Sequence, residues 1–125
     1  MPQLNSIGVK FKTDGINVTA TSAGASAQVL YTCPANFSAA VRFLHISSGT
    51  QANKKISVEY YNLEKNQYDH ILNGYDMASD DAYNIVNGGF FYMHAGDKVV
   101  CYTDTSGNFD VMISVEEFFD PQYKT

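Results

Sequence analysis

From Tyr31 to Asp120, short runs of alternating apolar and polar residues are separated by residues that favour turns. The turn signals recur roughly every 8–12 residues, which is the spacing of an all-β sandwich or barrel. No segment shows the periodicity of an amphipathic helix. The pattern therefore predicts an all-β fold, an antiparallel β-sandwich of about eight strands with a jelly-roll or immunoglobulin-like arrangement.

One predicted strand, at residues 41–46, is apolar on both faces. This fits a central position in a sheet or burial under another subunit, because a strand with one wet face alternates more regularly. Residues 56–61 do alternate, and residues 68–72 pair back on them as a hairpin. Further strands are predicted at residues 28–33, 82–86, 90–94, 98–103 and 109–116.

The start of the chain carries its own alternating pattern. Ile7, Val9 and Phe11 alternate with small or charged residues, and a second alternating run follows Asp14-Gly15. Because Asp-Gly between alternating runs is a strong turn signal, these residues are predicted to form a hairpin.

A linker of small residues follows this hairpin. Residues 19–27 (TATSAGASA) have no large side chain to anchor them in a core, so an extended or flexible connection is expected. We therefore divide the chain into an N-terminal hairpin and linker, residues 1–27, and a sandwich domain, residues 28–125. The N-terminal part is either a long loop within the domain or an arm that reaches a neighbouring subunit.

The acidic segment at residues 76–81 departs from strand alternation. Its composition suits the cap of a single helical turn. Asp76, Asp80 and Asp81 could supply oxygen ligands to calcium, but their spacing does not match a calcium-binding loop. A solvated acidic turn is the favoured interpretation.

Length and charge restrict the classes of partner. A chain of 125 residues fits one domain with one core, and its formal charge of −5 without a basic cluster argues against nucleic acid as a partner. No apolar stretch has the length of a signal peptide or a membrane span, so the protein is expected to be made in a cytoplasm without membrane insertion. Cys33 and Cys101 lie in apolar runs without metal-ligand spacing, and reduced, buried thiols are favoured over a disulfide.

The sequence carries no motif for an enzyme or a cofactor. The nucleophile elbow, the phosphate-binding loop and the zinc-protease pair are all missing, so no catalytic, cofactor-binding or metal-binding residue is predicted. His45, His70 and His94 lie on separate predicted strands, where histidines are more often hydrogen-bonded to the backbone than bound to a metal. Asp69-His70 and Asp97 offer still weaker support for acid–base chemistry.

Several strand and turn sequences resemble those of known proteins. They are the runs VLYTCPAN at residues 29–36, AVRFLHIS at residues 40–47 and ISVEYY at residues 56–61, and the strand–turn–strand run FFYMHAGDKVVCYT at residues 90–103. Together they are similar to small β-sandwich virion proteins of tailed bacteriophages, particularly cyanophage structural proteins. The likeness covers residues 28–117.

The resemblance implies a structural role in a virion. The expected function is that of a capsid decoration (cement) protein, at the capsid or tail surface, that binds and bridges major capsid protein subunits after assembly in the host cytoplasm. A homo-oligomer is also expected, because open sheet edges can recruit a neighbouring chain. The alternative is a tail, fibre or receptor-binding module that recognises host surface carbohydrate.

The aromatic content suggests which residues could contact partners. The chain has nine tyrosines and eight phenylalanines, which is more than a small sandwich core readily uses, and tyrosine suits interfaces. The competing interpretation is that these rings line sheet faces and strand ends. The predicted protein-contact residues are Ile7, Val9, Phe11, Tyr60, Tyr61, Tyr68, Tyr75 and Tyr83.

Overall fold

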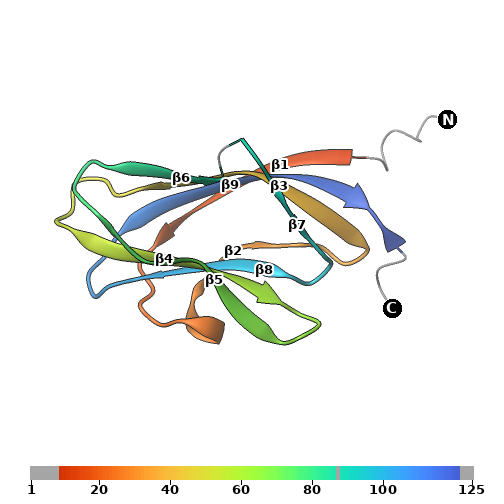
Figure 1. Ribbon diagram of the computed structural model, residues 1–125, viewed down its shortest axis with the longest axis horizontal. Helices are drawn as coiled ribbons and strands as arrows, with labels where there is room; N and C mark the ends of the chain where they lie inside the picture. The colour runs from red at the N-terminus through yellow and green to blue at the C-terminus, as the bar shows by residue number, and fades with distance from the viewer. Residues whose placement is uncertain (1–8, 87, 122–125) are drawn as a thin grey trace.

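The computed structural model describes residues 9–86 and 88–121. Two antiparallel sheets pack face to face, one above the other in Figure 1, and the predicted β-sandwich is confirmed. The strands in the described residues are β1 (Val9–Val18), β2 (Gln28–Thr32), β3 (Phe37–Ser47), β4 (Lys54–Asn62), β5 (Gln67–Met77), β6 (Ala82–Val86), β7 (Phe91–Met93), β8 (Lys98–Thr103) and β9 (Phe109–Phe119).

The first sheet has the strand order β1-β9-β3-β6, and β7 also pairs with β3; we call it the five-stranded sheet. The second, the four-stranded sheet, has the order β2-β8-β4-β5. β3 is paired on both sides, with β9 on one side and with β6 and β7 on the other. The strand is therefore central, as one of the two predicted explanations required. Its alternation is blurred because the register shift between Val41 and Phe43 turns Val41, Leu44 and Ile46 all toward the core.

The core lies between the two sheets and follows the predicted alternation. In β9, Phe109, Val111 and Ile113 point inward and are buried, whereas Asp110 and Met112 point outward and are exposed. Burial of one side of each strand supplies the main stabilising free energy. No helix among the described residues is long and apolar enough to cross a membrane.

The predicted hairpin at Asp14-Gly15 is wrong. β1 runs through both residues as one strand, and its ten residues pair in unbroken register with β9. Gly15 does not have the positive φ that the hairpin turn would need. Because β1 belongs to the five-stranded sheet, residues 9–18 are part of the sandwich and not of a separate arm; Ile7 lies outside the described residues.

The segment between β1 and β2 is fixed by backbone hydrogen bonds rather than by apolar side chains. It contains a single 3-10 turn, Gly24–Ser26. The Gly24 N–H donates to Oε1 of Glu59 at 3.1 Å, and the Thr103 N–H donates to the Ala20 carbonyl at 2.8 Å. The connection is therefore attached to the four-stranded sheet.

The single helical turn that the composition of residues 76–81 would suit is not formed. β5 continues to Met77, and the following residues make a turn held by Ser48. The Ser48 hydroxyl donates to the Ala78 carbonyl at 2.6 Å and accepts from the Asp81 N–H at 2.8 Å. Asp80 has φ of 58°, which is left-handed backbone that cannot continue a helix.

Candidate functional site

The outer face of the five-stranded sheet presents a group of large apolar side chains to solvent. Alternation along β1, β9, β3 and β7 places them on this side, opposite the core. Phe11 is 76% exposed and Tyr92 is 57% exposed, values unusual for large aromatic side chains in a folded domain. We call this surface the apolar face; it consists of Val9, Phe11, Phe43, Phe90, Tyr92, Met112 and Phe118.

One end of the apolar face carries an aromatic cluster with a single ion pair. The rings of Phe90 and Tyr92 meet edge to face with centroids 5.2 Å apart. The Arg42 guanidinium lies 5.2 Å from the Phe90 ring centroid, and its Nη1 lies 3.6 Å from Oε1 of Glu116. Because the two charges are paired with each other, this part of the face is close to electrically neutral.

The outer face of the four-stranded sheet is different, because the segment between β1 and β2 crosses part of it. Glu59 points to this side yet is buried, and its carboxylate accepts the Gly24 N–H. Its other oxygen lies 3.4 Å from Nε2 of His70, which in turn lies 3.3 Å from the Tyr102 hydroxyl. Polar contacts therefore dominate this face.

The tyrosines predicted to contact partners do not form one surface. Tyr61 and Tyr68 lie side by side on β4 and β5, with ring centroids 4.6 Å apart. The rings of Tyr75 and Tyr83 stack with their centroids also 4.6 Å apart. This contact connects β5, an edge strand of the four-stranded sheet, to β6, an edge strand of the five-stranded sheet. The structure therefore separates these four rings into two pairs, whereas the predicted Val9 and Phe11 lie on the apolar face.

Tyr60 belongs to the interior of the sandwich. Its ring packs edge-on against Phe91 with centroids 6.0 Å apart, and its hydroxyl donates to Asp97. We therefore remove Tyr60 from the predicted contact set, because its alternation with Tyr61 directs it toward the opposite sheet.

Sequence reasoning missed most of the apolar face. Phe90 and Tyr92 were within a predicted strand, but the side of the strand on which each side chain lies was not used to choose the contact residues. The signal that could have found them is the alternation around Phe91: if Phe91 faces the core, then Phe90 and Tyr92 face outward.

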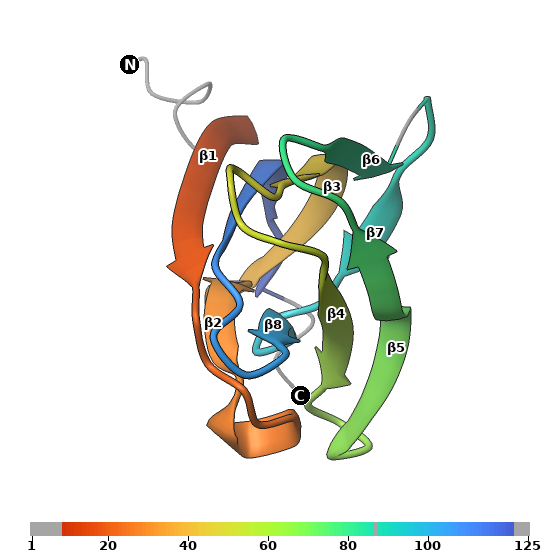
Figure 2. The same ribbon diagram turned by 90° about the vertical axis from the view of Figure 1, so that its left-hand side faces the viewer.

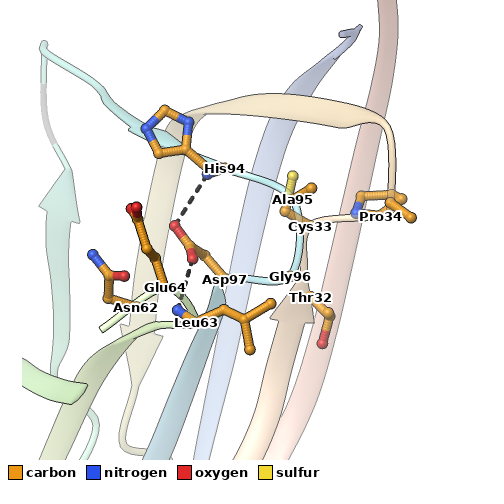
Figure 3. Close-up of a pocket in the computed structure, with 11 residues that line it drawn as sticks. Thr32, Cys33, Pro34, Asn62, Leu63, Glu64, His94, Ala95, Gly96 and Asp97 are labelled. Carbon is orange, nitrogen blue, oxygen red and sulfur yellow. Dashed lines mark hydrogen bonds between the residues drawn. The ribbon is translucent and has the colours of Figure 1, made fainter. Parts of the chain in front are cut away.

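A hollow of about 590 Å³ opens at one end of the sandwich, where three turns meet (Figure 3). Asp97 lines this hollow and is only 3% exposed. The carboxylate accepts the Leu63 N–H at 3.0 Å and the His94 N–H at 3.1 Å, in addition to the Tyr60 hydroxyl. Asp97 is therefore fully engaged in holding the turns together.

Cys33 lines the same hollow, and its thiol donates to the Phe37 carbonyl at 3.3 Å. Burial, together with the nearby Glu117 and Asp97 carboxylates, raises the pKa of Cys33 to about 12. The thiol therefore stays protonated at neutral pH, which is unfavourable for a nucleophile. Cys101 is buried between the sheets, and burial raises its pKa to about 12 as well.

We expect the stability of the protein to fall above pH 9 partly because of these thiols. Below the ordinary thiol pKa of 9.0, folded and unfolded chains both keep the Cys101 proton, and its contribution is fully present. As pH rises toward 12, only the unfolded chain loses that proton, which destabilises the fold by about 1.4 kcal/mol per pH unit. Urea unfolding across this range should show a shallower decline for Cys101→Ala than for the natural sequence. If stability declined equally steeply with pH in both proteins, the raised pKa of Cys101 would be contradicted.

The histidines do not converge. His45 lies on β3 with its Nδ1 2.6 Å from Oδ1 of Asn84, His70 lies on β5, and His94 precedes the turn at Asp97. Within residues 9–86 and 88–121, no group of three metal-ligating side chains is present.

Comparisons with known proteins bear on the fold alone. No family model and no curated protein matches the chain. A solved structure of Bacillus endospore appendages, described as a novel family of disulfide-linked pili, is similar with a TM-score of 0.52 and 11% sequence identity. The match covers 90% of this chain and 89% of that chain, so both share the sandwich architecture over nearly their whole length.

Proposed function

We propose that this chain is a virion structural protein of a tailed bacteriophage, a capsid decoration protein that binds and bridges major capsid protein subunits. The observation that carries the proposal is the apolar face, which spreads exposed rings over several strands of one sheet. A surface of this kind provides contact area for a partner protein and needs no reactive group. Many weak contacts of this type, repeated over a capsid lattice, give strong combined attachment.

The aromatic cluster at Arg42, Phe90 and Tyr92 is the expected centre of the contact. Aromatic side chains and arginine are enriched among the residues that dominate binding free energy at interfaces. Arg42 and Glu116 can be buried together, because each neutralises the other. The attachment is expected to be noncovalent, since both cysteines of the chain are buried and unbonded in the described structure.

The location of the protein can be measured by quantitative mass spectrometry of purified particles separated into capsids and tails. We expect the chain in the capsid fraction at many copies per particle. Its absence from both fractions would contradict the virion role.

The contact surface can be tested by adding purified protein to capsids that lack it. We expect the Phe90→Ser/Tyr92→Ser variant to lower its occupancy on the capsid about tenfold or more. Losing each aromatic side chain at the centre of an interface typically costs several times RT of binding free energy. Tyr61→Ser, on the opposite sheet, is the matched control and should bind normally. Unchanged occupancy of the double variant would place the contact elsewhere.

A carbohydrate-binding role is the alternative, and one observation favours it. Tyr61 and Tyr68 lie at the end of the β4–β5 hairpin, where the Tyr61 hydroxyl donates to Oδ1 of Asn66 at 2.7 Å. Rings beside carboxamides suit the stacking and hydrogen bonding of a sugar. This alternative predicts glycan binding that Tyr61→Ala abolishes and the Phe90→Ser/Tyr92→Ser variant leaves intact.

A further inference from the structure

The four outer edges of the two sheets differ in how well they could accept another strand. β2 and β6 have five residues each and contain register shifts, β7 has three residues, and the pairing of β5 with β4 is shifted at two places. β1 is ten residues long and pairs with β9 without any shift. Short or bulged edges resist further pairing, whereas a long regular edge offers a row of backbone donors and acceptors.

β1 is also the outermost strand at its edge of the five-stranded sheet. In Figure 2 it forms the left-hand border of the molecule, and in the described part of the chain its pairing partner is β9. β1 therefore has one paired side and one side on which a further strand can be added in the plane of the sheet.

The charges of β1 are arranged to complement a second copy of itself. Lys12 and Asp14 flank Thr13 on the inward side of the strand, where Lys12 Nζ lies 3.9 Å from Asp14 Oδ2 within one chain. If two copies of β1 pair antiparallel about a two-fold axis at Thr13, each Lys12 lies directly opposite the Asp14 of the second copy. Opposite charges in directly paired positions stabilise a sheet.

The same register also matches the apolar side of the strand. It places Phe11, the most exposed large apolar side chain of the described residues, opposite Gly15 of the second copy. A Cβ on Gly15 would lie 3.4 Å from Met112 Cγ, so a ring covering this glycine also covers the exposed Met112. A ring packed over a strand glycine restores the side-chain packing that the glycine lacks.

Registers with the axis two residues to either side of Thr13 are worse. An axis at Phe11 sets Lys10 against Lys12 of the second copy, which brings like charges together. An axis at Gly15 sets Asp14 against Ile16, which leaves the carboxylate without its partner charge.

We propose that β1 is a self-association edge, through which two copies of this chain join their five-stranded sheets into one continuous sheet with a two-fold axis at Thr13. The inference does not depend on the virion role, because it concerns the protein alone in solution. In such a dimer the apolar faces of the two chains lie on one continuous sheet, so the combined apolar face has twice the extent of the face on one chain.

The register is tested by cross-linking the full chain. In Thr13→Cys, the two new thiols face each other across the axis, and mild oxidation should convert most of the protein to a disulfide-linked dimer. Thr105→Cys, an exposed threonine in the β8–β9 turn, is the matched control and should remain mostly monomeric. Cys33 and Cys101 are buried and should not compete. Equal cross-linking of the two variants would overturn the register.

The charge pairing is tested by sedimentation equilibrium of the natural sequence and three variants. Lys12→Asp and Asp14→Lys each place like charges opposite each other, and each should raise the dissociation constant of the dimer about tenfold or more. The combined Lys12→Asp/Asp14→Lys variant reverses both charges and should recover most of the affinity. A natural chain that stays monomeric up to about millimolar concentration, or a combined variant as weak as the single ones, would overturn the proposal.

Discussion

Replacing Asp97 with alanine is expected to destabilise the protein by about 3–5 kcal/mol, a large part of the stability of an ordinary domain. The substitution leaves the Leu63 N–H, the His94 N–H and the Tyr60 hydroxyl without the carboxylate that accepts them. Because Asp97 is almost completely buried, water does not readily replace it. Urea unfolding followed by circular dichroism measures the loss.

The effect should be large because Asp97 connects three turns. Its side chain holds the β4–β5 turn through Leu63, and its own carbonyl accepts the Cys33 N–H at 2.9 Å, next to the β2–β3 turn. The Gly96 N–H donates to the Cys33 carbonyl at 2.9 Å, and Gly96 has φ of 87°, which favours glycine. Loss of the carboxylate should therefore loosen the whole end of the sandwich seen in Figure 3.

Two variants separate this role from the general loss of a charge. Asp104 also accepts a backbone N–H, from Lys55 at 3.1 Å, but it is exposed. Asp104→Ala should cost less than about 1 kcal/mol, because water can replace the lost acceptor. Tyr60→Phe removes one of the three donors to Asp97 and should cost about 1–2 kcal/mol. If Asp97→Ala were no worse than Asp104→Ala, the turns would not depend on this carboxylate.

Side-chain alternation predicted most of the strands because burial of one face is a local property of sequence. Phe109 and Val111 alternate with Asp110 and Met112 whatever strand pairs with β9, so the strand could be recognised without its partners. The central place of β3 was one of the two explanations predicted from its irregular apolar pattern, and the pattern itself comes from the register shift between Val41 and Phe43.

Long-range pairing accounts for the main error. Asp14-Gly15 has the composition of a hairpin turn, but the ten-residue pairing of β1 with β9 outweighs this local preference. The partner of β1 lies about a hundred residues away in the chain, and no local pattern near Asp14 identifies it. The same reason explains why residues 1–27 were set apart from the sandwich domain as a hairpin and linker.

The contact residues were only partly predictable because the direction of a side chain depends on register. Tyr60 and Tyr61 are adjacent and chemically identical, yet one points into the sandwich and the other points outward. Pairing shifts in β4 and β3 decide where each face begins. The role of Asp97 likewise depends on which turns the fold brings together at one end.

A second buried pair joins the two sheets directly. Tyr31 of β2 and Glu117 of β9 are both about 3% exposed, and the Tyr31 hydroxyl donates to Oε2 of Glu117 at 2.5 Å. Burial first, and then the bond to Glu117, raise the pKa of Tyr31 above its ordinary value. The hydroxyl therefore remains a donor at all physiological pH values.

We expect each single substitution in this pair to be costly and the two costs to be strongly coupled. Glu117→Leu leaves a buried, neutral tyrosine hydroxyl without its acceptor and should destabilise by about 1–3 kcal/mol, whereas Tyr31→Phe leaves a buried carboxylate without its donor and should destabilise by about 2–4 kcal/mol. The combined variant removes both polar groups, and should cost about 1–3 kcal/mol less than the sum of the single variants. Urea unfolding of the four proteins at neutral pH gives this difference directly.

An exposed pair provides the comparison that makes the coupling meaningful. The Gln67 amide donates to Oδ1 of Asp69 at 2.8 Å on the surface of β5. Gln67→Ala and Asp69→Ala should add within about 0.5 kcal/mol, because water satisfies whichever group remains. If the Tyr31–Glu117 pair were equally additive, its hydrogen bond would contribute little, and packing of β2 against β9 alone would hold this side of the sandwich. A large coupling confined to the buried pair would instead show that a single polar contact fixes how the two apolar sheets are aligned.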